Sequence, residues 1–200
     1  MAHNLDCYLL RPARSADAPR LAAMSQAHVE RGLKPAWGAA RIRWYVRDAE
    51  SVVLTAWLGS AIAGFAIMRY GEDVAHLNLL AVDPAHRRRG VGRTLLGWLE
   101  QSALTAGTFT IGLELRAGNE LARTFYRAMG YRELGQIPGY YQGIESAIRM
   151  ARDLRALSEN AYRERPAPNV FRVVKERLRE CPVDGSTSGG TISTEKAVSN

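Results

Sequence analysis

Several residues that could do chemistry lie in the stretch 81–96, which reads AVDPAHRRRGVGRTLL. An apolar run over residues 77–82 ends at Asp83-Pro84, where a strand must stop because proline has no N–H to donate to a ladder. Three arginines then lead into Gly90-Val91-Gly92, and apolar residues recur at helical spacing after them. A strand, a basic loop and a helix in this order place unpaired backbone N–H groups at the positive end of a helix dipole. The stretch therefore predicts a binding site for a polyanion, most simply a pyrophosphate.

Two common nucleotide-binding loops do not fit this stretch. A Walker loop needs Lys-Ser or Lys-Thr after its second glycine, but Gly92 is followed by Arg93-Thr94. A dinucleotide loop needs a third glycine at the position where Leu95 stands. What remains is the pattern Arg-x-x-Gly-x-Gly. Each of its residues alone has an ordinary alternative, because loop glycines often only make turns and arginines often line a solvated face.

A candidate general base lies in the next predicted strand. Glu114 stands between Leu113 and Leu115, which should point to the opposite face of that strand from Glu114. A carboxylate in a mostly apolar strand could take up a proton, directly or through a water. The alternative is a salt bridge to Arg116, which shares the face of Glu114.

A candidate proton donor lies in the predicted helix 120–129. Tyr126 carries a phenol, whose pKa of about 10 suits protonation of a leaving group. The alternative for Tyr126 is a core tyrosine with a satisfied hydroxyl. Asn119 precedes this helix and is a good N-cap. His76 and His86 flank the strand before the basic loop and are predicted to face solvent.

The elements that must position these residues alternate along the chain. A mixed sheet with helices on both faces is expected, an α/β (α+β) fold in which a strand, loop and helix near the centre form a usual ligand site. A loop with Trp37 between the first two helices is either a lip of a substrate site or a core anchor. The predicted strands are residues 8–12, 52–58, 62–70, 77–82, 110–115, 131–137 and 146–150, and the predicted helices are residues 15–32, 39–48, 91–106 and 120–129.

Length and composition indicate one domain with an extension. The chain has 200 residues and 46% hydrophobic content, so residues 1–155 are expected to form a single domain. Residues 156–200 form a polar extension with one possible helix at 169–180 and a remainder predicted to be disordered. Neither a membrane span nor a signal peptide is evident, which predicts a cytoplasmic protein. Cys7 and Cys181 lie far apart, so neither a disulfide framework nor a metal site is expected.

The formal net charge of +7 comes from 27 Lys and Arg against 20 Asp and Glu. Because the arginines are spread along the chain, with no basic run interleaved with aromatic residues, direct nucleic-acid binding is not expected. The charge instead favours anionic ligands or a ribonucleoprotein environment.

Four segments in this order resemble the GNAT superfamily of N-acetyltransferases: residues 80–84, 87–96, 113–119 and 125–131. More narrowly, they are similar to bacterial ribosomal-protein-alanine N-acetyltransferases, and the resemblance covers about residues 77–150. It implies a mixed, mostly antiparallel sheet of about seven strands with helices on both faces. It also implies transfer of an acetyl group from acetyl-CoA to a primary amine, such as the N-terminal amine of a ribosomal protein.

The resemblance assigns roles to particular residues. Glu114 would be the general base and Tyr126 the general acid. Tyr140 and Tyr141 resemble a paired-tyrosine hairpin that covers the first residues of an acceptor peptide, and Trp37 joins them as a candidate substrate contact. The residues expected to bind the cofactor are Leu80, Ala81, Val82, Arg87, Arg88, Arg89, Gly90, Val91, Gly92, Arg93 and Asn119.

Two departures from the family leave alternatives open. The family often has Glu-Asp before its last strand, whereas this chain has Glu145-Ser146, and residues before about 75 match only in general pattern. The acceptor is therefore expected to be either a protein N-terminus or a small amine of the antibiotic or polyamine type, with the protein acting as a monomer or homodimer. A non-catalytic sensor of acyl-CoA is the alternative from another class.

Overall fold

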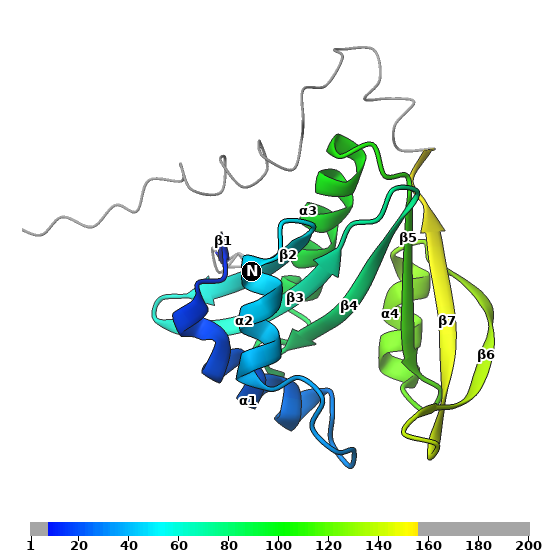
Figure 1. Cartoon of the computed structure of the whole chain (residues 1–200), viewed down its shortest axis with the longest axis horizontal. Coiled ribbons are helices and arrows are strands. Elements are labelled where there is room, and N and C mark those ends of the chain that lie inside the picture. Colours follow the sequence, from blue (N-terminus) through cyan, green and yellow to red (C-terminus); the bar gives the residue numbers. More distant parts are fainter. Residues whose placement is uncertain (1–7, 156–200) are drawn as a thin grey trace, which may run out of the picture.

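A seven-stranded sheet with the strand order β1-β2-β3-β4-β5-β7-β6 runs through residues 8–155, the part of the chain that this computed structural model describes (Figure 1). Neighbouring strands are antiparallel except for β4 and β5. The elements are β1 (Leu9–Pro12), α1 (Ala18–His28), α2 (Ala39–Arg47), β2 (Ser51–Leu58), β3 (Ala61–Arg69), β4 (Val74–Val82), α3 (Val91–Thr105), β5 (Thr110–Arg116), α4 (Glu120–Ala128), β6 (Arg132–Tyr141) and β7 (Glu145–Asp153). Short 3-10 turns lie at Ser15–Asp17 and Pro84–His86.

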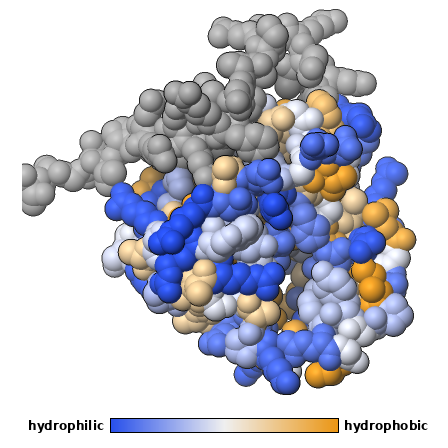
Figure 2. All heavy atoms as spheres, in the orientation of Figure 1, coloured by the Kyte–Doolittle hydropathy of each residue, from blue (hydrophilic) through white to orange (hydrophobic). Residues whose placement is uncertain are grey.

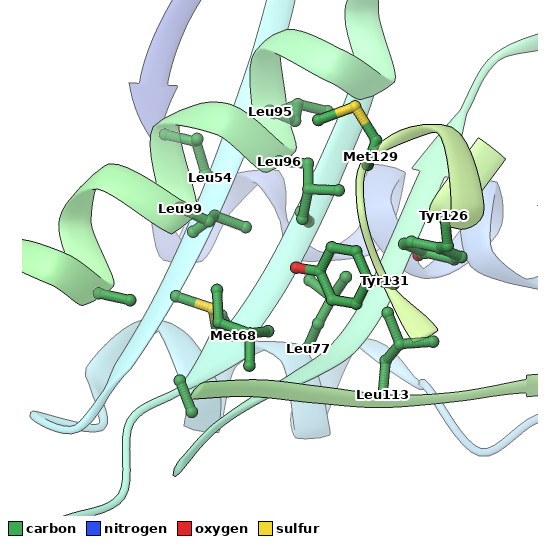
Figure 3. Close-up of a cluster of buried hydrophobic side chains, with 14 of the residues drawn as sticks. Leu54, Met68, Leu77, Leu95, Leu96, Leu99, Leu113, Tyr126, Met129 and Tyr131 are labelled. Atoms are coloured by element: carbon green, nitrogen blue, oxygen red, sulfur yellow. The ribbon is translucent and has the colours of Figure 1, made fainter. Parts of the chain in front are cut away.

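Two hydrophobic cores cover the two faces of the sheet. On one face, α1 and α2 pack against β2, β3 and β4 through residues such as Leu21, Ile42 and Phe65. On the other face, α3 and α4 share a core with residues from β2 to β7. Figure 3 shows Leu96 and Leu99 of α3 pointing toward this second core. Burial of each such side chain stabilises the fold by about 1.5–3 kcal/mol.

The ladder between β4 and β5 is short. Residues Val74, Ala75 and His76 of β4 pair with β5, after which the two strands diverge although both continue. A register shift opposite Ile67 makes Asn78 a bulge, so that Leu77 and Leu79 point to opposite faces. Figure 2 shows the surface hollowed between the diverging parts of the sheet. We call this opening between β4 and β5 the split.

The predicted fold class and sheet are confirmed, with two corrections to the elements. β6 continues to Tyr141, so the loop predicted at residues 138–143 is wrong and shrinks to the turn after Tyr141. Pro138 can lie in this strand because β6 is at the edge of the sheet. On the open side of an edge strand no neighbouring strand needs the N–H that proline lacks. The first helix is shorter than the predicted range 15–32: it begins at Ala18, after a 3-10 turn and with Pro19 in its first turn, and it ends at His28.

Some expectations fall outside what can be compared. The helix predicted at residues 169–180, the rest of the extension and both cysteines lie outside the described residues. The domain boundary at residue 155 therefore stays a prediction. Within residues 8–155, none of the helices is both long and apolar enough to span a bilayer.

Candidate active site

The basic loop ends in the backbone geometry that an anion site needs. Gly90 is the N-cap of α3 with φ of 86°, in the left-handed region that glycine adopts at little cost. No side chain caps the helix, and its first backbone bond runs from the Thr94 N–H to the Gly90 carbonyl at 2.9 Å. The N–H groups of the three preceding residues therefore have no helical acceptor and are available to a ligand.

Two glycines bring the start of α3 to the end of β4. A Cβ on Gly64 would lie 2.9 Å from the Ala81 carbonyl oxygen and 3.0 Å from Cγ1 of Val91. A Cβ on Gly92 would meet the Phe125 ring at 3.4 Å. The absence of side chains here lets β3, β4, α3 and α4 converge beside the split.

The arginines of the loop have different surroundings. Arg87 is exposed, and its Nε donates to the Val82 carbonyl at 3.2 Å, which holds its guanidinium beside the end of β4. Arg88 has φ of 61°, and Arg88, Arg89 and Arg93 are exposed. These three exposed arginines lie in the loop before α3 or in its first turn, next in sequence to its uncapped N–H groups.

The end of β4 has one free edge. Leu80, Ala81 and Val82 pair with β3 on one side. On the other side the ladder with β5 has already ended at His76. Backbone groups along this edge are left for a ligand, since in a strand the N–H and C=O groups are obligatory hydrogen-bonding groups.

Glu114 lies across the split from this edge, with both carboxylate oxygens engaged. His76 Nε2 is 2.7 Å from Oε2, Arg149 Nε is 2.9 Å from Oε1, and the glutamate side chain is only 9% exposed. Burial by itself would raise the pKa of Glu114, but hydrogen bonds and charge from Arg149 and His76 together hold that pKa below its usual value. The carboxylate is therefore ionised at neutral pH, the state that a general base requires.

Tyr126 is buried in α4 with its ring edge-on to Phe125 and Tyr131, at centroid distances of 5.1 and 5.5 Å. Burial, followed by the effect of nearby Tyr141, raises the pKa of Tyr126. Its phenol therefore stays protonated at neutral pH, as a proton donor must. Leu113 and Leu115 share the core of Tyr126, so Glu114 and Tyr126 approach the split from opposite faces of the sheet.

The two tyrosines at the end of β6 connect this strand to the base. The Tyr141 hydroxyl donates to the main-chain oxygen of Glu114 at 3.3 Å, and the Tyr140 and Tyr141 rings meet edge-on at 5.0 Å. Burial, and then the charge of Glu114, raise the pKa of Tyr140, which remains half-exposed. The structure thus brings Tyr126, Tyr140 and Tyr141 together with Glu114.

Two other predicted site residues have structural contacts. Trp37 donates its backbone N–H to Glu30 at 3.1 Å, and its ring packs against Tyr45 at 5.3 Å with Arg41 on its face at 4.3 Å. These contacts are those of a core anchor. Asn119 accepts from the Ala122 N–H at 3.1 Å and so caps α4.

The predicted surroundings of Glu114 need correction. The alternative salt bridge to Arg116 is wrong, because Arg116 Nε pairs with Glu145 at 2.6 Å. His76 bonds to Glu114 rather than only facing solvent, because it lies in the last residue pair of the β4–β5 ladder. His86 lies beside the Tyr8 hydroxyl at 3.2 Å.

Three residues of the site were not predicted. Gly64 had a signal, since a glycine inside an apolar strand indicates a close approach. His76 and Arg149 had none, because their contact with Glu114 depends on strand pairings over 38 and 35 residues of separation.

Comparisons with known proteins agree with this geometry. The profile of the acetyltransferase (GNAT) family matches residues 21–131, more than half of the chain. Ribosomal protein bS18-alanine N-acetyltransferase of Salmonella typhimurium is 43% identical over 93 residues, which are 45% of this chain and 63% of that protein. The matched segment thus spans less than two thirds of that relative.

Solved structures extend the likeness over most of the fold. The ribosomal-protein-S18-alanine N-acetyltransferase of Escherichia coli superposes with a TM-score of 0.64 at 28% identity, covering 74% of this chain and 94% of that one. An acetyltransferase of Bacillus anthracis, solved in complex with acetyl coenzyme A, has a TM-score of 0.51 at 26% identity and covers 55% of this chain and 66% of that one. The chain belongs to the acetyltransferase (GNAT) family.

Proposed function

We propose that this protein is an N-acetyltransferase that transfers acetyl from acetyl-CoA to the N-terminal amine of a protein, such as a ribosomal protein. The observation that carries the proposal is the ionised Glu114 held at the split, across from the free edge of β4. The names of the relatives from Salmonella and E. coli support the acceptor class. With such an acceptor, the protein works in the cytoplasm.

The residues present fit acetyl-CoA. The free N–H groups at the start of α3 and the exposed Arg88, Arg89 and Arg93 suit a pyrophosphate. The free edge of β4 suits the amide-bearing pantetheine arm, which can add to a strand edge as a peptide does. When bound, acetyl-CoA supplies an acetyl group activated as a thioester.

The groups around the split then have separate roles in the reaction. Glu114 takes a proton from the acceptor amine, directly or through a water, because only the neutral amine is a nucleophile. His76, whose side chain is 42% exposed and whose Nε2 lies 2.7 Å from the carboxylate, connects Glu114 to solvent. Backbone N–H groups near Val82 stabilise the negative charge that develops on the thioester oxygen. Tyr126 protonates the departing thiolate.

The residues beside Glu114 support the N-terminal amine of a peptide as the acceptor. Tyr140 and Tyr141 border Glu114 at the end of β6, and aromatic side chains beside a base can cover the first residues of a peptide.

The test uses the full chain with acetyl-CoA. A peptide beginning with alanine, the same peptide with a blocked N-terminus, and free polyamines and aminoglycosides are compared as acceptors. Acetylation of the free peptide, lost in Glu114→Gln and reduced in Tyr126→Phe, is the expected result. Glu133→Gln is the matched control, because Glu133 pairs with Arg123 and Arg127 away from the split.

Two results would contradict the proposal. Acetylation of small amines alone would identify a small-molecule acetyltransferase. Binding of acetyl-CoA without transfer to any amine would identify a sensor of acyl-CoA.

A further inference from the structure

Arg149 in β7 pairs directly across the ladder with Glu114 in β5. Its Nε donates to the glutamate at 2.9 Å, while its Nη atoms form no hydrogen bond with any residue between 8 and 155. The side chain is 53% exposed although it contacts a nearly buried carboxylate. A guanidinium presents donors in a rigid fork, so the edge formed by the two Nη atoms can bind a second carboxylate with two hydrogen bonds.

The surface beside Arg149 is low and open. Its neighbour across the ladder on β6 is Gly135, where an added Cβ would meet nothing within 4 Å. Gly112 and Ala151, which pair with each other on the same face, also carry no side chain beyond Cβ. The helix α4 packs on the opposite face, whereas α1 and α2 pack against β2 to β4 (Figure 1). An extended peptide can therefore approach Arg149 from the split.

The other charged groups on this face are already paired or lie farther along the sheet. From β4, His76 bonds to Glu114. From β5, Arg116 pairs with Glu145 and also donates to the Arg31 carbonyl at 2.7 Å. On β6, Tyr140 borders Glu114 without carrying a charge at neutral pH, and Arg132 lies opposite Ala151. Among these groups of the sheet, Arg149 is the arginine that both contacts the base and keeps about half of its side chain exposed.

We propose that Arg149 is a specificity-determining residue that binds a carboxylate on the second residue of the acceptor peptide. The inference rests on the proposed function, because it concerns the acceptor of the same site. One residue of an extended chain spans about 3.3–3.6 Å, so a peptide whose amine faces Glu114 brings its second side chain within reach of the adjacent guanidinium. Acceptors with aspartate or glutamate in that position are then preferred over those with lysine or arginine.

The experiment compares three peptides that begin with Ala-Asp, Ala-Asn or Ala-Lys and are otherwise identical. The expected kcat/KM of the wild-type protein is about tenfold or more higher for Ala-Asp than for Ala-Lys, as a charge-assisted bidentate pair would give. Arg149→Gln removes most of this preference, Arg149→Lys keeps part of it, and Arg149→Glu reverses it. The ratio of kcat/KM between peptides reports on Arg149 itself. If a substitution only misaligned Glu114, it would lower the rates for all three peptides by the same factor and leave this ratio unchanged.

Arg132→Gln is the control, since Arg132 lies on the same face but opposite Ala151 rather than Glu114. It should leave the preference unchanged. A wild-type protein that does not distinguish the peptides, or a preference that persists in Arg149→Gln, overturns the assignment of Arg149. Acetylation of small amines only is a separate result that overturns the proposed function. In that case Arg149 is tested with two small acceptors, an amino acid, which carries a carboxylate, and its amide, which does not. Equal rates of acetylation for both would overturn the role of Arg149.

Discussion

The two parts of the sheet that meet at the split are stabilised in different ways. Strands β2 and β3 are almost continuously buried between α1 and α2 on one face and α3 on the other. Strand β6 is mostly exposed, and its part of the sheet carries ion pairs instead, such as Arg123 with Glu133 and Arg116 with Glu145. The proposed donor site thus lies on an apolar core, and the proposed acceptor site lies on a more polar surface.

This difference fits the demands of the two substrates. The donor is one invariant molecule, so its site gains from a fixed backbone at Gly90 and along the edge of β4. The acceptor must enter and leave as part of another chain, and charged side chains such as Arg149 can move at little cost. The comparison predicts that changes in the first part mainly affect stability, whereas changes near Glu114 mainly affect catalysis.

The largest effect is expected for Glu114→Gln. Removal of a general base costs about 10²–10⁴-fold in kcat, while the KM for acetyl-CoA stays close to that of the wild type because the donor binds on the other side of the split. Steady-state kinetics with both substrates measure this. If kcat were unchanged, Glu114 would not be the base.

A pair of leucine substitutions tests the stability side of the comparison. Leu96 of α3 is fully buried, and Leu96→Ala should lower the free energy of unfolding by about 2–5 kcal/mol. Leu134 of β6 is 65% exposed, and Leu134→Ala should change that free energy by no more than about 0.5 kcal/mol. Urea titration of both variants measures the difference. Equal losses would show that the two parts of the sheet contribute alike.

Gly64→Ala tests the contact between the core and the donor site. The added Cβ would come too close to the Ala81 carbonyl and to Val91, so β4 or α3 must shift. We expect a loss of about 1–3 kcal/mol in stability together with a higher KM for acetyl-CoA. A matched Gly97→Ala in α3, where nothing lies within 4 Å, should leave the KM for acetyl-CoA near its wild-type value and raise the free energy of unfolding by about 0.5–1 kcal/mol, because alanine favours a helix interior over glycine. If Gly64→Ala were destabilised but kept the wild-type KM for acetyl-CoA, the close packing at Gly64 would not determine the shape of the donor site.

The pH dependence of the base should shift in Arg149→Gln. The pKa of Glu114 is lowered in the folded protein, so its charge stabilises the fold above the unfolded-state pKa, and this contribution is lost as the pH falls through the folded-state pKa. Without Arg149 the pKa of Glu114 rises, and the acidic limb of kcat/KM moves to higher pH. A rate profile measured from pH 4 to 8 would show this, given that an ordinary glutamate titrates at about 4.3. An unmoved limb would mean that Arg149 does not act on the base.

The two sides of the split also differ in how well the sequence predicts them. The anion loop was readable because its strand, glycines and helix are contiguous, and Gly90 and the start of α3 lie where the pattern placed them. Glu114 was identified as a candidate, but its partners were not, since His76 and Arg149 reach it through pairings of distant strands. The end of β6 was misread because proline and glycine usually mark loops, yet an edge strand tolerates both.

The smallest effect is expected for Glu133→Gln in the polar part of the sheet. Glu133 accepts from Arg123 and contacts Arg127, and these charges hold the pKa of its carboxyl below its usual value. Because Glu133 and its arginine partners are all partly exposed, water and salt replace much of the lost attraction. The thermal midpoint and the kcat for peptide acceptors should both stay near the wild-type values, and added salt should remove any residual difference. A clear loss of stability would show that the ion pairs of β6, and not only the apolar core, determine how firmly the acceptor side is held.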